Sequence, residues 1–123
     1  MPSSSSYKDL RVWQQAMKLA AEVYRQTTIF PKHEMYGLTQ QMRRAAVSIA
    51  SNIAEGKGHR SNREFCQFLF HARGRCWSCK PQLMIANELQ YLSKDESQSL
   101  QDLAEGVGRA LAGLINSLRE SAA

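Results

Sequence analysis

Apolar residues recur at steps of three and four along almost the whole chain, which is the spacing of one face of an α-helix. Four such stripes follow one another, and the alternating pattern typical of strands is absent. None of these faces can be buried by its own helix. The pattern therefore predicts an all-α, antiparallel up-down four-helix bundle, with residues 7–120 as a single domain. The stripes are Leu10, Val12, Trp13, Ala16, Met17, Ala20, Val23 and Tyr24; Leu38, Met42, Ala45, Ile49 and Ile53; Phe65, Phe68, Leu69, Ala72, Cys76, Cys79, Leu83 and Ala86; and Leu100, Leu103, Val107, Leu111, Leu114 and Leu118.

Residues that end or start helices separate these stripes. Pro31 follows the first stripe, and Gly56-Lys57-Gly58 follows the second, where glycine reaches a left-handed cap conformation at low cost. Ser61–Glu64 and Ser93–Glu96 have the spacing of capping boxes, in which the side chains of serine and glutamate satisfy backbone donors. They predict the starts of the third and fourth helices.

Proline and glycine inside two of the predicted helices conflict with helix propensity. Pro81 removes a hydrogen bond from the third helix at a cost of about 3 kcal/mol, so we expect a kink or a break near Cys76–Pro81. Gly106, Gly108 and Gly113 in the fourth helix each cost about 1 kcal/mol relative to alanine. We interpret them as positions of close helix packing.

The composition indicates a soluble protein whose positive charge is concentrated in the middle of the chain. The 123 residues carry a net charge of +5. Residues 41–80, with eight Lys/Arg and two Asp/Glu, carry a net charge of +6, and the rest of the chain is slightly negative. We expect residues 1–6 to be a disordered tail rather than an export leader, and we expect no membrane segment. The odd number of cysteines, three, then predicts reduced thiols in the cytoplasm.

Basic residues near the second and third helices form the strongest candidate site. Such a set could hold the phosphates of RNA or DNA by releasing counterions. The alternative is a solvated face that forms salt bridges with the acidic fourth helix of another subunit. The candidates are Arg43, Arg44, Lys57, His59, Arg60 and Arg63. A second line on the second helix, beside its apolar stripe, is a candidate oligomer interface made of Gln41, Ser48, Asn52 and Glu55. These side chains could contact a neighbouring subunit or form hydrogen bonds within the bundle.

The sequence lacks the patterns that would indicate catalysis or a cofactor. Cys76 and Cys79 have the spacing of a redox or metal pair, but a redox pair needs a preceding strand and zinc needs two further ligands at suitable spacing. We interpret these cysteines as structural. There is no nucleophile triad, paired-acid arrangement typical of general acid–base catalysis, or complete phosphate loop. We therefore expect neither metal nor cofactor, and no enzymatic activity.

Two segments resemble a known family. Leu10–Ala16 (LRVWQQA) is similar to the L-x-V-W-Q-x-A opening of the four helix bundle protein family, also called the 23S rRNA-intervening sequence protein family, and Arg43–Gly56 (RRAAVSIASNIAEG) resembles its second helix. The resemblance implies an up-down bundle that assembles as a homopentamer. It also implies distant similarity to the accessory protein of diversity-generating retroelements, which binds its reverse transcriptase and nucleic acid.

The chain departs from this family's pattern between Gly74 and Leu83. Family members typically read G-S-L-x-E-L-x-T-Q-L there, whereas this chain reads GRCWSCKPQL. A dropped base followed by a compensating insertion would convert one string into the other, so we hypothesise that a compensated frameshift produced residues 75–81.

Taken together, the residues and the resemblance predict a non-enzymatic, self-assembling interaction protein that binds RNA or DNA through a basic face. The alternative is a structural scaffold or accessory subunit that contacts only other proteins. Nucleic-acid binding should weaken steeply with salt, whereas protein scaffolding should not.

Overall fold

The computed structural model describes residues 6–122, and helices account for nearly all of them. Two short 3-10 turns precede the first and second long helices. The elements are η2 (Tyr7–Asp9), α1 (Arg11–Thr27), η3 (Lys32–Glu34), α2 (Leu38–Lys57), α3 (Asn62–Glu88) and α4 (Lys94–Ala122).

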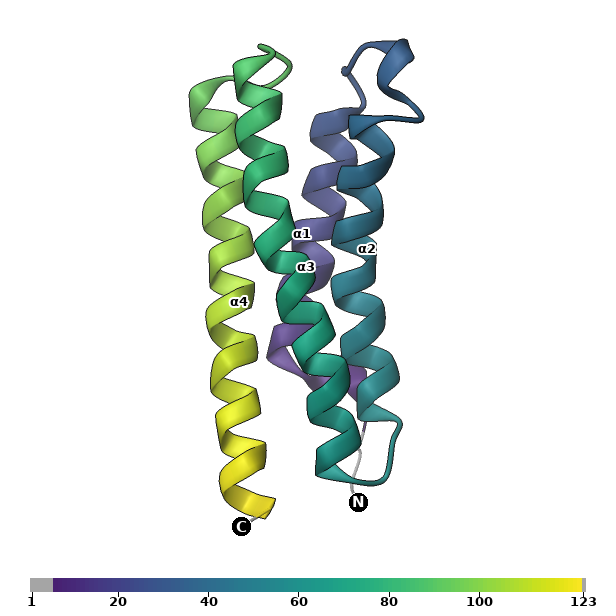
Figure 1. Cartoon of the computed structure of the whole chain (residues 1–123), viewed down its shortest axis with the longest axis vertical. Helices are drawn as coiled ribbons and strands as arrows, with labels where there is room; N and C mark the ends of the chain where they lie inside the picture. Colours follow the sequence, from purple (N-terminus) through teal and green to yellow (C-terminus); the bar gives the residue numbers. More distant parts are fainter. Residues whose placement is uncertain (1–5, 123) are drawn as a thin grey trace.

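The four long helices run alternately in opposite directions, as Figure 1 shows. α1 packs against α2 and α4, and α3 packs against the same two helices, which gives a four-sided bundle. No strand occurs between residues 6 and 122. The predicted all-α, antiparallel up-down bundle is confirmed. Within the same residues, no helix is both long enough and apolar enough to span a bilayer.

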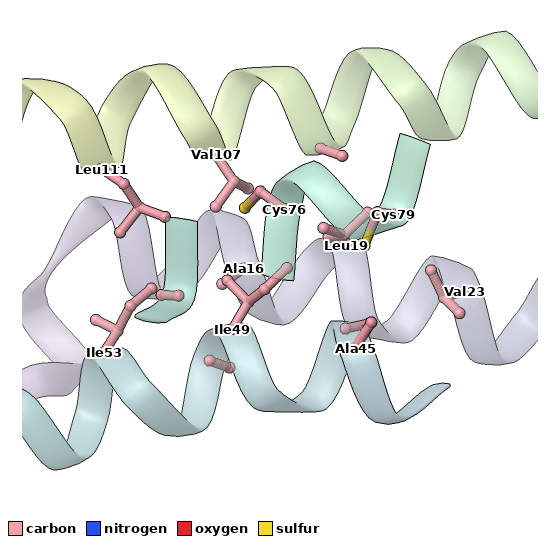
Figure 2. Packing of buried hydrophobic residues seen from close by; sticks show 14 of the residues in the cluster. Ala16, Leu19, Val23, Ala45, Ile49, Ile53, Cys76, Cys79, Val107 and Leu111 are labelled. Carbon is pink, nitrogen blue, oxygen red and sulfur yellow. The ribbon is translucent and has the colours of Figure 1, made fainter. Parts of the chain in front are cut away.

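The predicted apolar stripes meet in one core along the bundle axis. Leu19, Ile49, Leu69 and Leu111 come from four different helices, and each is completely buried. Figure 2 shows three of them beside the smaller side chains that fill the spaces between the helices. Burying a side chain of this size stabilises the fold by about 1.5–3 kcal/mol. Because the four stripes cover one another, the position of each helix depends on the other three.

Side-chain caps start the third and fourth helices as the sequence predicts. Ser61 Oγ accepts a hydrogen bond from the Glu64 N–H at 3.1 Å. Ser93 Oγ accepts one from the Glu96 N–H at 3.0 Å, and the Glu96 carboxylate accepts one from the Ser93 N–H at 2.8 Å. The predicted tail of residues 1–6 lies outside the described residues except for Ser6, whose Oγ accepts a hydrogen bond from the Lys8 N–H.

The end of α2 differs from the expected glycine cap, and α3 ends in a left-handed residue that is not glycine. α2 does end beside Gly58, but this glycine has a φ of −75° and is not left-handed. At the end of α3, Gln90 takes the left-handed conformation instead, with a φ of 65°. The N–H of the next residue, Tyr91, donates to the Ala86 carbonyl at 2.9 Å. A non-glycine residue therefore turns the chain from α3 to α4.

Pro81 does not interrupt the third helix. Of the kink or break expected near Cys76–Pro81, the break is absent, because α3 runs continuously from Asn62 to Glu88. Cys76 and Cys79 before the proline, and Leu83 after it, are all buried in the core. Their burial keeps the backbone helical on both sides of Pro81 and outweighs the missing hydrogen bond.

Close helix packing occurs at a glycine of α2 and not at the glycines of α4. A Cβ atom at Gly56 would lie 2.7 Å from Phe68 Cβ and 2.9 Å from Phe65 Cδ1. A Cβ at Gly108 or Gly113 would meet nothing within 4 Å. The expected close packing at the α4 glycines is therefore absent within the chain, and Gly56 brings α2 against α3.

We predict that Gly56→Ala destabilises the protein by about 1–3 kcal/mol, because the added methyl group overpacks the contact between α2 and α3. The control Gly113→Ala adds the same methyl group at an open helical position and should stabilise it by up to about 1 kcal/mol. Urea unfolding followed by circular dichroism measures both free energies. Equal or greater stability of the Gly56→Ala protein would contradict this account of the packing.

Candidate nucleic-acid interface

The turn between α2 and α3 brings four of the six predicted basic residues to one end of the bundle. Lys57 is the last residue of α2, His59 and Arg60 lie in the turn, and Arg63 is the second residue of α3. Figure 1 places this turn at the same end as the end of α4. His59, Arg60 and Arg63 are exposed. The close packing at Gly56 and the Ser61 cap fix where this turn lies.

Aromatic rings and a carboxylate hold two of these basic residues against the bundle. Lys57 Nζ lies 5.8 Å from the centroid of the Phe65 ring. The His59 ring stacks on Phe68 with centroids 4.8 Å apart, and its Nδ1 lies 3.7 Å from Glu64 Oε2. Contacts of this kind restrict the conformations of these two side chains.

Arg60 and Arg63 are the side chains of the turn that remain available. Within residues 6–122, neither guanidinium lies within ion-pair distance of a carboxylate. Glu64, the nearest acid in sequence, accepts from Ser61 Oγ at 3.0 Å and faces His59. The helix N-terminus beside Arg63 adds the partial positive charge of free backbone N–H groups. The turn can therefore attract an anion without first breaking an internal salt bridge at either arginine.

Arg43 and Arg44 do not belong to this cluster. They precede Lys57 by about four turns of α2, which corresponds to about 20 Å along the bundle. Arg43 binds the end of α1, donating from Nε to Thr27 Oγ1 at 2.9 Å, and its guanidinium lies 4.5 Å from the centroid of the Tyr24 ring. The structure therefore divides the predicted basic face in two and gives Arg43 an internal structural role.

Two of the four residues predicted as an oligomer interface on α2 form hydrogen bonds within the chain. Asn52 Nδ2 donates to the Ser48 carbonyl at 2.8 Å and to Ser48 Oγ at 3.0 Å. Gln41 and Glu55 are exposed at the two ends of the line. The outer members are therefore the ones free to meet another molecule.

All three cysteines are buried, and burial disfavours the thiolate form of Cys76 and Cys79. Burial raises the pKa of Cys76 to about 12 and that of Cys79 to about 11. Cys66 is also buried, and all three are free of disulfides. In the described part of the chain, no three His, Cys, Asp or Glu side chains gather closely enough to hold a metal ion.

A polar cluster that the sequence did not reveal joins the connections at the opposite end of the bundle. Tyr91 O–H donates to Glu34 Oε2 at 2.9 Å, and Glu34 Oε1 accepts from the Leu38 N–H at 3.1 Å. These two hydrogen bonds lower the pKa of the Glu34 carboxyl. Phe30 packs against the Tyr91 ring with centroids 5.1 Å apart. The residues of this polar cluster are far apart in the sequence and are common residue types, so they form no recognisable sequence motif.

The sequence also did not indicate that Phe70 and Arg119 meet near the basic turn, because they lie on different helices. Phe70 lies off the apolar stripe of α3 and is 44% exposed, and the Arg119 guanidinium of α4 lies 5.9 Å from the centroid of its ring. An aromatic residue outside the stripe was the signal that could have identified this position as part of a surface site.

The fold and the surface together define a four-helix bundle that presents a basic turn at one end. The chain belongs to the 23S rRNA-intervening sequence protein family, whose model matches residues 8–113. This membership agrees with the resemblance seen in the sequence.

A solved structure supports the same architecture. It is a protein of unknown function from the S23 ribosomal protein family of Bacteroides thetaiotaomicron VPI-5482, and it superposes with a TM-score of 0.76. The two are 18% identical, and the similarity covers 85% of this chain and 97% of that one, so it supports the fold alone. Comparison with curated proteins gives no match.

Proposed function

We propose that this protein is a cytoplasmic, non-enzymatic interaction protein that assembles with copies of itself and binds RNA or DNA through the turn between α2 and α3. The observation that carries the proposal is the exposed pair Arg60 and Arg63, which have no carboxylate partner among residues 6–122. Phosphate is the anion that repeated guanidinium groups bind well, because their donors match its oxygen atoms.

Self-assembly would strengthen nucleic-acid binding, because the contact between a single basic turn and phosphate is weak. A single turn offers few phosphate contacts, whereas each copy in a symmetric ring adds an identical set along one strand or duplex. The ring of five is what the resemblance to the family implies. The exposed apolar side chains of the outer surface support association, and they include Tyr36 (87% exposed) and Trp77 (71% exposed).

A protein scaffold without nucleic-acid contact is the second candidate. The observation that favours it is a run of exposed apolar side chains near the end of α3, formed by Met84, Ile85 and Leu89. Such a patch fits another protein better than a phosphate backbone. The two candidates differ in their response to salt, because only phosphate binding depends on counterion release.

We predict that the protein shifts RNA or DNA in gels at low salt and that Arg60→Ala/Arg63→Ala weakens this binding. Each lost phosphate contact should lower the slope of log affinity against log salt by about 0.7 for single strands and about 0.9 for duplexes. The control Arg75→Ala/Lys94→Ala removes the same charge from exposed positions elsewhere and should change the slope less. Absence of a shift at low salt would contradict nucleic-acid binding and favour the scaffold, whereas equal effects of the two variants would contradict binding by this turn.

We also predict that sedimentation velocity finds an oligomer whose association depends on the outer members of the α2 line. Gln41→Lys/Glu55→Lys places like charges on neighbouring copies and should weaken association by about tenfold or more. The control Glu88→Lys/Gln98→Lys makes the same charge change at exposed positions of α3 and α4. A monomer at every concentration would contradict self-assembly, and dissociation of the control alone would place the interface elsewhere.

A further inference from the structure

A groove between the start of α3 and the end of α4 extends the basic end of the bundle. Its volume is about 540 Å³, which is within the range of sites that hold small organic groups. The groove adjoins the turn between α2 and α3, because its lining residue Arg63 comes directly after this turn, near the start of α3. None of its lining residues is acidic; they are Asn62, Arg63, Cys66, Gln67, Phe70, Leu118 and Arg119.

The groove combines an exposed aromatic ring with two guanidinium groups from different helices. Phe70 leaves 44% of its surface exposed, although a residue of this type is usually buried. Arg119 approaches the ring from α4, with its guanidinium carbon 5.9 Å from the ring centroid. Neither Arg63 nor Arg119 forms an ion pair within residues 6–122. The groove therefore offers one partly exposed aromatic ring together with two positive charges.

We propose that this groove binds single-stranded nucleic acid, with one base stacked on Phe70 and the neighbouring phosphates at Arg63 and Arg119. The inference rests on the proposed function and adds the strandedness of the ligand. Any of the bases can stack on an aromatic side chain, so this contact does not depend on the sequence of the strand, and a guanidinium can stack on the same base. Such a site needs a base that is free of the double helix.

A duplex would use this surface less well. Its bases are already stacked on one another, so Phe70 would meet only sugar and phosphate, and an exposed phenyl ring gains little there. The two arginines would still contact phosphates. We therefore expect duplexes to bind through charge alone and single strands to bind through charge and stacking.

A second copy of the chain fits the groove less well than a nucleic-acid strand does. An occupant that is a protein would bury two guanidinium groups in a site without any acidic side chain, and would have to supply the carboxylates itself. A nucleic-acid strand supplies both the flat apolar surface and the negative charge. This difference in complementarity decides between the two occupants.

The test measures the affinity of the full chain for a short labelled single-stranded RNA and for the same strand annealed to its complement. Phe70→Ala should weaken single-strand binding by about tenfold, the loss expected for one stacked base, and leave duplex binding and both salt slopes unchanged. Phe70→Tyr keeps a stacking ring and should retain single-strand binding. The control Tyr24→Ala removes an aromatic residue outside the groove that is equally exposed (45%) and also lies under an arginine, and it should have little effect. Arg119→Ala should lower the single-strand slope by about 0.7.

The remaining outcomes separate the inference from the function on which it rests. Equal effects of Phe70→Ala on single strands and duplexes, or no effect on either, would overturn the stacking site while the basic turn still bound phosphate. Absence of binding by the unaltered protein at low salt would overturn the proposed function as well. If Phe70→Ala instead changed the sedimentation of the protein and not its RNA affinity, the groove would be an interface between copies.

Discussion

The mutual burial of four apolar stripes is the constraint on which every other feature of this protein depends. Leu19, Ile49, Leu69 and Leu111 are completely buried only because each helix covers the stripes of its neighbours (Figure 2). Most of the stability of a helix in a protein comes from packing of its amphipathic face, so these helices are held in place by this core more than by their own propensity. The core also explains how the helix α3 tolerates Pro81 and a sequence that departs from the pattern of the family.

The two ends of the bundle carry different chemistry because the core fixes which loops meet. At one end, a hydrogen bond from Tyr91 to Glu34 and the tilted contact between the Tyr91 and Phe30 rings join the connections, so the Glu34 carboxylate finds its partners within the chain. At the other end, Arg60 and Arg63 have no carboxylate partner among the described residues. The first end is suited to holding the fold together, and the second is suited to binding an anion.

The helices were predictable from sequence because their signals are local. The stripes repeat within a few residues, and Ser61 and Ser93 lie three residues before the glutamates with which they form caps. The left-handed Gln90 was not predictable, because the packing of two long helices and not residue preference selects that conformation. Continuity through Pro81 likewise depends on burial on both sides of the proline, which is a property of the whole core.

The candidate site was predictable only in part, because a basic face depends on which residues the fold brings together and not only on which are neighbours in the sequence. Lys57, His59, Arg60 and Arg63 were found together because one short turn contains them. Arg43 was predicted with them, but its contact with Thr27, which lies on another helix, has no signal in the local sequence. Arg119 was missed for the same reason, because the ring that it approaches belongs to α3.

Hydrogen–deuterium exchange of the full chain, with and without a short single-stranded RNA at low salt, tests most directly whether the basic end is the binding surface. The account predicts slower exchange in the turn between α2 and α3 and at the end of α4, and unchanged exchange around η3 and Gln90. Protection confined to the end that holds Glu34 and Tyr91, or unchanged exchange everywhere, would contradict it.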